Sequence, residues 1–179
     1  LEFADRREYD LYILDMAPTG HALEVLEFPQ VIRDWLSKAY RGLTKHDRDM
    51  PLDNLQALGE KIMKSTVATR RIRQALTEPL KTEFVAVTIP EAMSIAEVKR
   101  LLSAVSRLGI PCHHIVVNMI VPPTECDSCS SRREEQLKYV GELVDPESSE
   151  HLLSGVPLFT QQIRGVPQLK ELARILYEQ

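Results

Sequence analysis

The chain of 179 residues lacks several features that would reveal its function directly. No segment approaches the roughly 20 consecutive apolar residues of a membrane-spanning helix, and no signal peptide opens the sequence. Lysine and arginine number 22 against 26 aspartate and glutamate residues, so there is no basic excess for nucleic-acid binding. Only three cysteines occur, too few for a disulfide framework. These features predict a globular cytoplasmic protein that is not itself transmembrane and binds no nucleic acid.

A phosphate-binding loop is also missing, since GxxxxGK[ST] does not occur. Residues 11–21 nevertheless have one pattern of a nucleotide site. The apolar run 11–14 predicts a buried strand that delivers Asp15 at its carboxyl end, before a polar turn. The pattern alone leaves two interpretations open. Asp15 lies near a metal or phosphate, with Thr19, Gly20 and His21 responding to it, or it merely caps the turn.

Two amphipathic helices are predicted next. Apolar residues recur at helical spacing over 31–43 and again over 55–76. Basic residues follow the polar side of the second segment: Lys61, Lys64, Arg70, Arg71 and Arg73. The pattern fits either a binding subdomain or a helical hairpin that only covers a sheet.

The second half of the chain alternates strand and helix patterns, which predicts a mostly parallel α/β sheet flanked by helices. The capping box Ser94-x-x-Glu97 predicts one helix start, and Gly109 predicts the end of that helix. The expected order is strand 84–89, helix from Ser94, strand 115–120, helix 132–144, strand 157–160 and helix 167–177.

Glu91 and Asn118 are polar residues at or near the ends of predicted strands. Glu91 is placed to reach a ligand at the carboxyl edge of the sheet, or to favour a helix N-terminus. Asn118 interrupts an apolar strand, and a buried amide needs partners for its carbonyl and its NH2 group. An adenine edge provides both, as do backbone groups, so both residues have two interpretations.

Cys126 and Cys129 form a CxxC pair, the usual spacing for one side of a tetrahedral zinc site. One pair supplies only half of the ligands. A two-fold dimer supplies the other half from its second copy. A redox pair and an unliganded reduced pair are the alternatives.

The heptapeptide of residues 15–21, DMAPTGH, closely resembles the D-T-A-P-T-G-H segment of the ArsA-type ATPases, with Met16 in place of threonine. This family comprises the arsenical-pump ATPases and the ATPases that target tail-anchored membrane proteins. In the family the segment is the second switch. The resemblance implies that Asp15 lies on the Mg²⁺ and water side of a bound ATP. It also implies that the switch residues transmit loss of the γ-phosphate to a helical subdomain; these are Pro18, Thr19, Gly20 and His21.

Three later segments resemble the same family, in the family's order. Residues 88–91, TIPE, resemble T-x-P-E, whose glutamate, here Glu91, contacts the nucleotide. The strand carrying Asn118 resembles V-N-x-x-x-P, whose asparagine reads adenine. The adenine loop P-L-F-x-x-E-V-x-G is matched at Pro157, Leu158 and Phe159, with Gln162 where glutamate is common. The targeting branch also places a zinc-binding CxxC after this asparagine.

The resemblance implies that residues 1–179 are the C-terminal portion of a P-loop-type α/β ATPase domain, with 28–76 as a short helical insert. The intact protein is then a homodimeric ATPase using ATP and Mg²⁺. Its client is an apolar segment of a tail-anchored membrane protein, or an anion such as arsenite. The insert holds only Met50 and Met63, and no cysteine precedes Pro111, so neither client is strongly supported. Without the P-loop we expect this chain alone to be inactive. The alternative function is a non-catalytic, zinc-dimerised module that binds an apolar partner.

Overall fold

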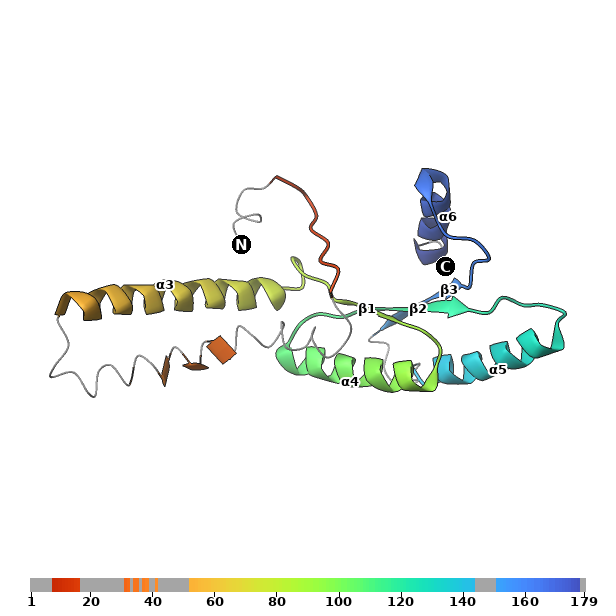
Figure 1. Ribbon diagram of the computed structural model, residues 1–179, viewed down its shortest axis with the longest axis horizontal. Coiled ribbons are helices and arrows are strands. Elements are labelled where there is room, and N and C mark those ends of the chain that lie inside the picture. The colour runs from red at the N-terminus through yellow and green to blue at the C-terminus, as the bar shows by residue number, and fades with distance from the viewer. Residues whose placement is uncertain are drawn as a thin grey trace. The chain divides into compact units, whose positions relative to one another are not determined.

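The computed structural model describes residues 8–16, 31–32, 34–35, 37–38, 41, 52–143 and 151–177. The chain forms two compact units, Leu1–Thr82 and Glu83–Gln179. The labelled elements follow the order α3 (Leu52–Leu76), β1 (Val85–Thr88), α4 (Ala92–Leu108), β2 (His114–Ile120), α5 (Asp127–Gly141), β3 (Leu152–Pro157) and α6 (Gly165–Tyr177) (Figure 1).

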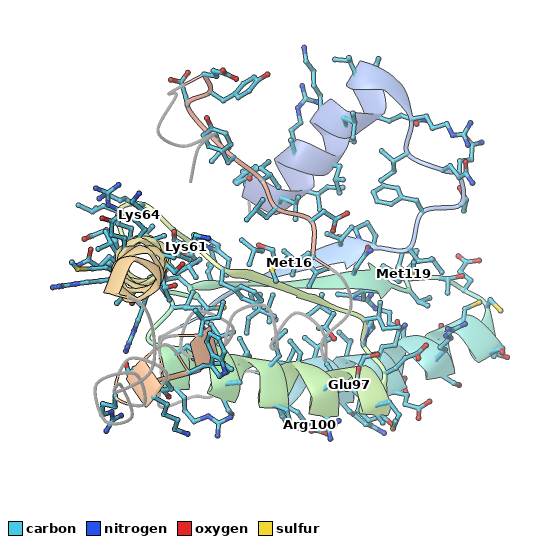
Figure 2. All side chains as sticks on the ribbon, turned by 60° about the vertical axis from the view of Figure 1, so that its left-hand side comes forward. Met16, Lys61, Lys64, Glu97, Arg100 and Met119 are labelled. Atoms are coloured by element: carbon cyan, nitrogen blue, oxygen red, sulfur yellow. The ribbon has the colours of Figure 1, made fainter. Side chains whose placement is uncertain are left out.

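The described part of the first unit is dominated by helix α3, which has 25 residues. Its end at Leu76 is where the apolar periodicity predicted it. The Thr77 N–H and hydroxyl both donate to the Arg73 carbonyl at 3.0 Å, which closes the last turn. Described residues between 31 and 41 are also helical, as the sequence predicted. Lys61 and Lys64 lie on the exposed surface of α3 (Figure 2).

The prediction of a buried strand at residues 11–14 is wrong. Residues 8–16 form no strand, and Leu11, Ile13 and Leu14 have exposed fractions of 74, 84 and 80%. A parallel strand is buried only when neighbouring strands pair with it and helices cover both faces. An apolar run of four residues does not specify these neighbours, which is why its pattern alone misled.

The second unit contains a three-stranded parallel sheet in the order β1–β2–β3. Helix α4 packs on β1, α5 on β2 and α6 on β3. Helices α4 and α5 lie along one face of the sheet, and α6 lies on the other (Figure 1). The α/β prediction with parallel strands flanked by helices is confirmed.

The core of this unit lies between the sheet and α4. Ala86, Val98, Ile115 and Val117 form one buried cluster, each no more than 2% exposed. The two of these residues on β2, Ile115 and Val117, are β-branched, which suits a strand that is covered on its faces. On the opposite surface of α4, Arg100 points away from the sheet (Figure 2).

Helix α4 begins earlier than its capping box predicted. Glu91 is the N-cap, and its carbonyl accepts the first helical hydrogen bond from the Ile95 N–H at 2.9 Å. Ser94 lies inside the first turn, where its carbonyl accepts a bond from the Thr88 hydroxyl at 3.2 Å. The predicted end is confirmed, since Gly109 has φ 72° in the left-handed conformation that favours glycine.

The last three elements also differ in their bounds from the prediction. Strand β3 ends at Pro157, where the sequence predicted a strand to begin, because Ser154 and Gly155 hide its pattern among polar and small residues. Helix α5 begins at Asp127, before the charged stretch that predicted it. Helix α6 begins at Gly165, two residues before its predicted start.

Candidate functional site

The carboxyl ends of all three strands meet at one edge of the sheet, because the strands are parallel. Thr88 pairs with Val117, which pairs with Gly155, and Ile120 pairs with Pro157 one step further along. Ligands of open α/β sheets bind outside this edge. The predicted nucleotide residues in this unit, Glu91, Asn118 and 157–159, all come from this edge.

Glu91 lies three residues beyond the end of β1 and is exposed. Its backbone has extended dihedrals, φ −130° and ψ 145°, and its side chain makes no capping hydrogen bond. The alternative interpretation, that Glu91 favours a helix N-terminus, agrees with its position as the N-cap of α4, although no capping bond is formed. Among the described residues this carboxylate has no hydrogen-bond partner, so it is available to a ligand.

Asn118 lies next to an irregularity in β2. Its Oδ1 accepts a hydrogen bond from the Met119 N–H at 2.9 Å, and Met119 has φ 63°. This left-handed conformation costs a non-glycine residue on the order of 1–2 kcal/mol. The register between β2 and β3 shifts between Val117 and Ile120 at the same point. Met119 lies at the carboxyl end of β2 (Figure 2). The carbonyl side of the Asn118 amide thus bonds to backbone, while its NH2 group has no partner among the described residues.

Sequence reasoning missed Gln136 and Arg133 on α5, which both bond to the segment that follows Asn118. Gln136 is only 5% exposed, and its amide bonds to Val121 N–H and to the Met119 carbonyl. Arg133 donates to the Val121 carbonyl. A glutamine and an arginine in a helix with a run of charges are typical of a solvated face, so no local pattern distinguishes them.

The chain leaving β3 carries the third predicted group of nucleotide residues. The Leu158 N–H donates to the Ile120 carbonyl at 2.8 Å, which fixes this chain beside the end of β2. Leu158 and Phe159 are 41% and 37% exposed. Partly exposed apolar side chains at a ligand-binding edge suit contact with a flat apolar group such as a purine base.

Cys126 and Cys129 are both exposed at the start of α5, with Cys126 as its N-cap. The neighbouring backbone N–H and thiol of Cys129 lower the pKa of Cys126, although the Cys126 side chain makes no capping hydrogen bond. The neighbouring Cys126 sulfur in turn raises the pKa of Cys129. This arrangement favours a thiolate at Cys126 and a thiol at Cys129.

The cysteine pair offers two sulfur ligands, and four complete a tetrahedral zinc site. In the part of the chain that the structure describes, no three His, Cys, Asp or Glu side chains are grouped so that they bind a metal together. Any full zinc site at this pair therefore needs ligands from outside these residues.

Residues of the predicted switch lie in the first unit. Asp15 is exposed at the end of the described segment 8–16. Pro18, Thr19, Gly20 and His21 lie outside the described residues.

None of the described helices has the length and apolar character to cross a membrane.

Comparison with known proteins adds to this geometry. Residues 1–178 match the family model of the ArsA-type anion-transporting ATPases. The chain belongs to this family. The match covers both units and every residue of the candidate site.

Several curated relatives are similar over nearly the whole chain. The ATPase ASNA1 homolog 2 of Paramecium tetraurelia is 30% identical over 188 residues, covering 96% of this chain and 57% of the relative. The ATPase GET3 of Malassezia globosa is 32% identical, covering 94% and 55%. An ATPase ASNA1 homolog of Entamoeba dispar is 33% identical, covering 93% and 53%. The chain spans about half the length of these relatives.

Proposed function

We propose that this chain is the nucleoside-binding part of an ATP-hydrolysing enzyme of the ArsA family. The observation that carries the proposal is the convergence of Glu91, Asn118 and residues 157–159 at the carboxyl edge of one parallel sheet. The Glu91 carboxylate and the Asn118 NH2 group have no partner among the described residues, and the Leu158 and Phe159 side chains are partly exposed. Asn118 binds the adenine edge, Glu91 binds the nucleoside, and Phe159 and Leu158 contact the base.

Hydrolysis in the intact protein needs groups that hold the phosphates. Phosphoryl transfer depends mostly on positioning and on charge stabilisation, which bound Mg²⁺ supplies together with a phosphate-binding loop. Asp15 acts on the Mg²⁺ and water side of the phosphates. The switch residues Pro18, Thr19, Gly20 and His21 transmit loss of the γ-phosphate to the helical insert predicted at residues 28–76. Because the phosphate-binding loop is not in this sequence, the 179 residues alone bind nucleotide weakly and do not hydrolyse it.

The client we propose is the apolar segment of a tail-anchored membrane protein. The CxxC at Cys126 and Cys129 favours this branch of the family over anion export. Two copies of the pair, one from each protomer of a homodimer, supply the four sulfur ligands of a zinc ion. The lowered pKa of Cys126 supports this role, because zinc binds the thiolate.

The proposal is tested by calorimetric titration of ADP into the full-length protein and its Asn118→Ala variant. We expect the variant to bind ADP about tenfold more weakly, the loss typical of one bidentate base contact. We expect its thermal unfolding without nucleotide to show only the loss of the bond from the Met119 N–H to Asn118, about 1 kcal/mol. Equal ADP affinity in the two proteins would remove Asn118 from the site.

The second candidate is a non-catalytic module that dimerises through zinc and binds an apolar partner. The exposed cysteine pair at the start of α5 is the observation that favours it. Such a module shows no change of melting temperature with ATP or ADP, and it becomes monomeric when zinc is removed. The enzyme requires nucleotide-dependent stabilisation in the full-length protein.

A further inference from the structure

Helix α5 is tied to the end of β2 by hydrogen bonds that end on the main chain. The Gln136 Oε1 accepts a bond from the Val121 N–H at 2.8 Å, and its Nε2 donates to the Met119 carbonyl at 3.2 Å. Arg133 adds a bond of 2.5 Å to the Val121 carbonyl. Gln136 is buried, so its bonds are protected from water. Met119 and Val121 follow closely after Asn118 in the chain.

The end of β2 at Met119 needs stabilising contacts, because its backbone conformation is unfavourable by itself. Met119 has φ 63°, and β2 loses its register with β3 at this point. The turn at Met119 also aims the Met119 N–H at the Asn118 Oδ1. If Met119 relaxed to ordinary strand dihedrals, this bond would be lost and the Asn118 amide would return to its other rotamers.

We propose that Gln136 is a positioning residue that sets the base preference of the nucleotide site. This inference rests on the proposed function, in which Asn118 binds adenine. By holding the turn at Met119, Gln136 keeps the Asn118 amide in one orientation. Adenine presents a donor at N6 beside an acceptor at N7, whereas a 6-oxo purine presents two acceptors. Only a fixed amide distinguishes these two patterns.

Glutamine suits this position because one side chain provides a donor and an acceptor together. Gln136→Leu removes both bonds at similar volume. Gln136→Glu keeps an acceptor for the Val121 N–H, but places a second oxygen near the Met119 carbonyl. Gln136→Leu therefore loses both bonds to the main chain at the end of β2, whereas Gln136→Glu loses one of them.

The test measures ADP and inosine diphosphate binding to the full-length protein by calorimetric titration. We expect the wild type to prefer ADP by about tenfold. In Gln136→Leu we expect this ratio to fall below about twofold, mainly through weaker ADP binding, with Gln136→Glu intermediate. Lys138→Gln is the matched control, because Lys138 is exposed on the same helix and its charge changes by the same unit as in Gln136→Glu. The control should keep the wild-type ratio.

A purely structural role for Gln136 gives a different result. It would lower the melting temperature and weaken both nucleotides equally, so an unchanged ratio in the folded variants overturns the inference. If Gln136→Leu does not fold, Gln136→Glu, which retains one bond, carries the test.

Asn118→Ala separates this inference from the proposed function. If Asn118→Ala abolishes the preference and Gln136→Leu does not, the proposed function stands and the role of Gln136 is wrong. If the wild type has no preference for ADP over inosine diphosphate, the base-reading role of Asn118 fails, and the inference fails with it. If both variants abolish the preference and the double variant adds nothing further, the two residues act through one contact, as proposed.

Discussion

Polar side chains at the amino edge of the sheet bond to one another, whereas at the carboxyl edge the Glu91 carboxylate and the Asn118 NH2 group have no partner among the described residues. At the amino edge, Glu83 accepts a bond from the His113 N–H at 2.6 Å and contacts His113 Nδ1 at 2.8 Å and His114 Nδ1 at 3.3 Å. His151 Nδ1 bonds to the Cys112 carbonyl at 2.8 Å. These bonds link the segments at the amino ends of the three strands.

At the carboxyl edge the same kinds of groups are left available. The Glu91 carboxylate and the Asn118 NH2 group have no partner among the described residues, and the backbone at Met119 is strained. Polar groups that satisfy one another stabilise a fold, and groups without partners are open to a ligand. We therefore propose that the amino edge contributes to stability and that the carboxyl edge binds the ligand.

The largest expected effect on stability comes from a substitution in the buried core between the two edges. Ile115→Ala removes a side chain that is 1% exposed in the core between them. We expect a loss of about 2–5 kcal/mol in the free energy of unfolding, because the cavity adds to the lost burial. Urea unfolding of the full-length protein measures it. A loss below about 1 kcal/mol would mean that Ile115 is not in a tightly packed core.

Glu91→Gln tests the carboxyl edge alone. Because the Glu91 carboxylate makes no bond among the described residues, we expect unchanged stability, within about 0.5 kcal/mol. ADP affinity should fall by about fivefold to tenfold, since a charged hydrogen bond becomes neutral. Calorimetric titration and thermal unfolding together check this. Loss of stability without loss of affinity would reverse the role given to this edge.

Glu83→Gln makes the same chemical change at the amino edge and should have the opposite result. We expect a loss of about 1 kcal/mol in stability or less, because the cluster is partly exposed, and unchanged ADP affinity. Burial acts to raise the pKa of Glu83, but hydrogen bonds from His113 and His114 outweigh it and lower the pKa below 4.5.

The direction of this shift determines how stability depends on pH. A lowered folded pKa means that Glu83 stabilises the fold fully above its unfolded pKa, and that this is lost as the pH falls through the folded value. The difference in stability between wild type and Glu83→Gln should therefore shrink as the pH is lowered below about 4.5. A difference that grows in acid would contradict the pairing.

The smallest expected effect is a difference in thiol reactivity between Cys112 at the amino edge and the cysteine pair beyond the carboxyl edge, with no change in stability. Burial raises the pKa of Cys112, just before β2, to about 11, while the neighbouring backbone N–H of Cys129 lowers the pKa of Cys126, beyond the end of β2. In the presence of a metal chelator, iodoacetamide at neutral pH should label Cys126 first, Cys129 later and Cys112 last. Mass spectrometry of the labelled peptides gives the order. Cys129→Ser should leave the Cys126 rate nearly unchanged, because the largest cause is the backbone N–H of residue 129. Labelling of Cys112 first would contradict the assignment.

Much of the second unit was predictable from the sequence. Strand β2, the end of α4 at Gly109 and the parallel sheet follow from β-branched runs, apolar periodicity and a glycine at a helix end. Candidate residues such as Glu91 and Asn118 stood out because polar groups end or interrupt apolar runs. The bounds of β3 and α5 were harder, because Gly155, Ser154 and the CxxC segment have no period of their own.

The sequence by itself determined the fold class, the family and which residue types lie at the strand ends, since these depend on local patterns and on motifs in order. Only the tertiary structure decided that Glu83 is paired while Glu91 has no partner in the described part of the chain, that Met119 is left-handed, and that Gln136 is buried. These features arise from contacts between residues up to about 30 positions apart in the chain, as with Glu83 and His113. Such contacts depend on how elements pack, and no periodicity within a single element records them.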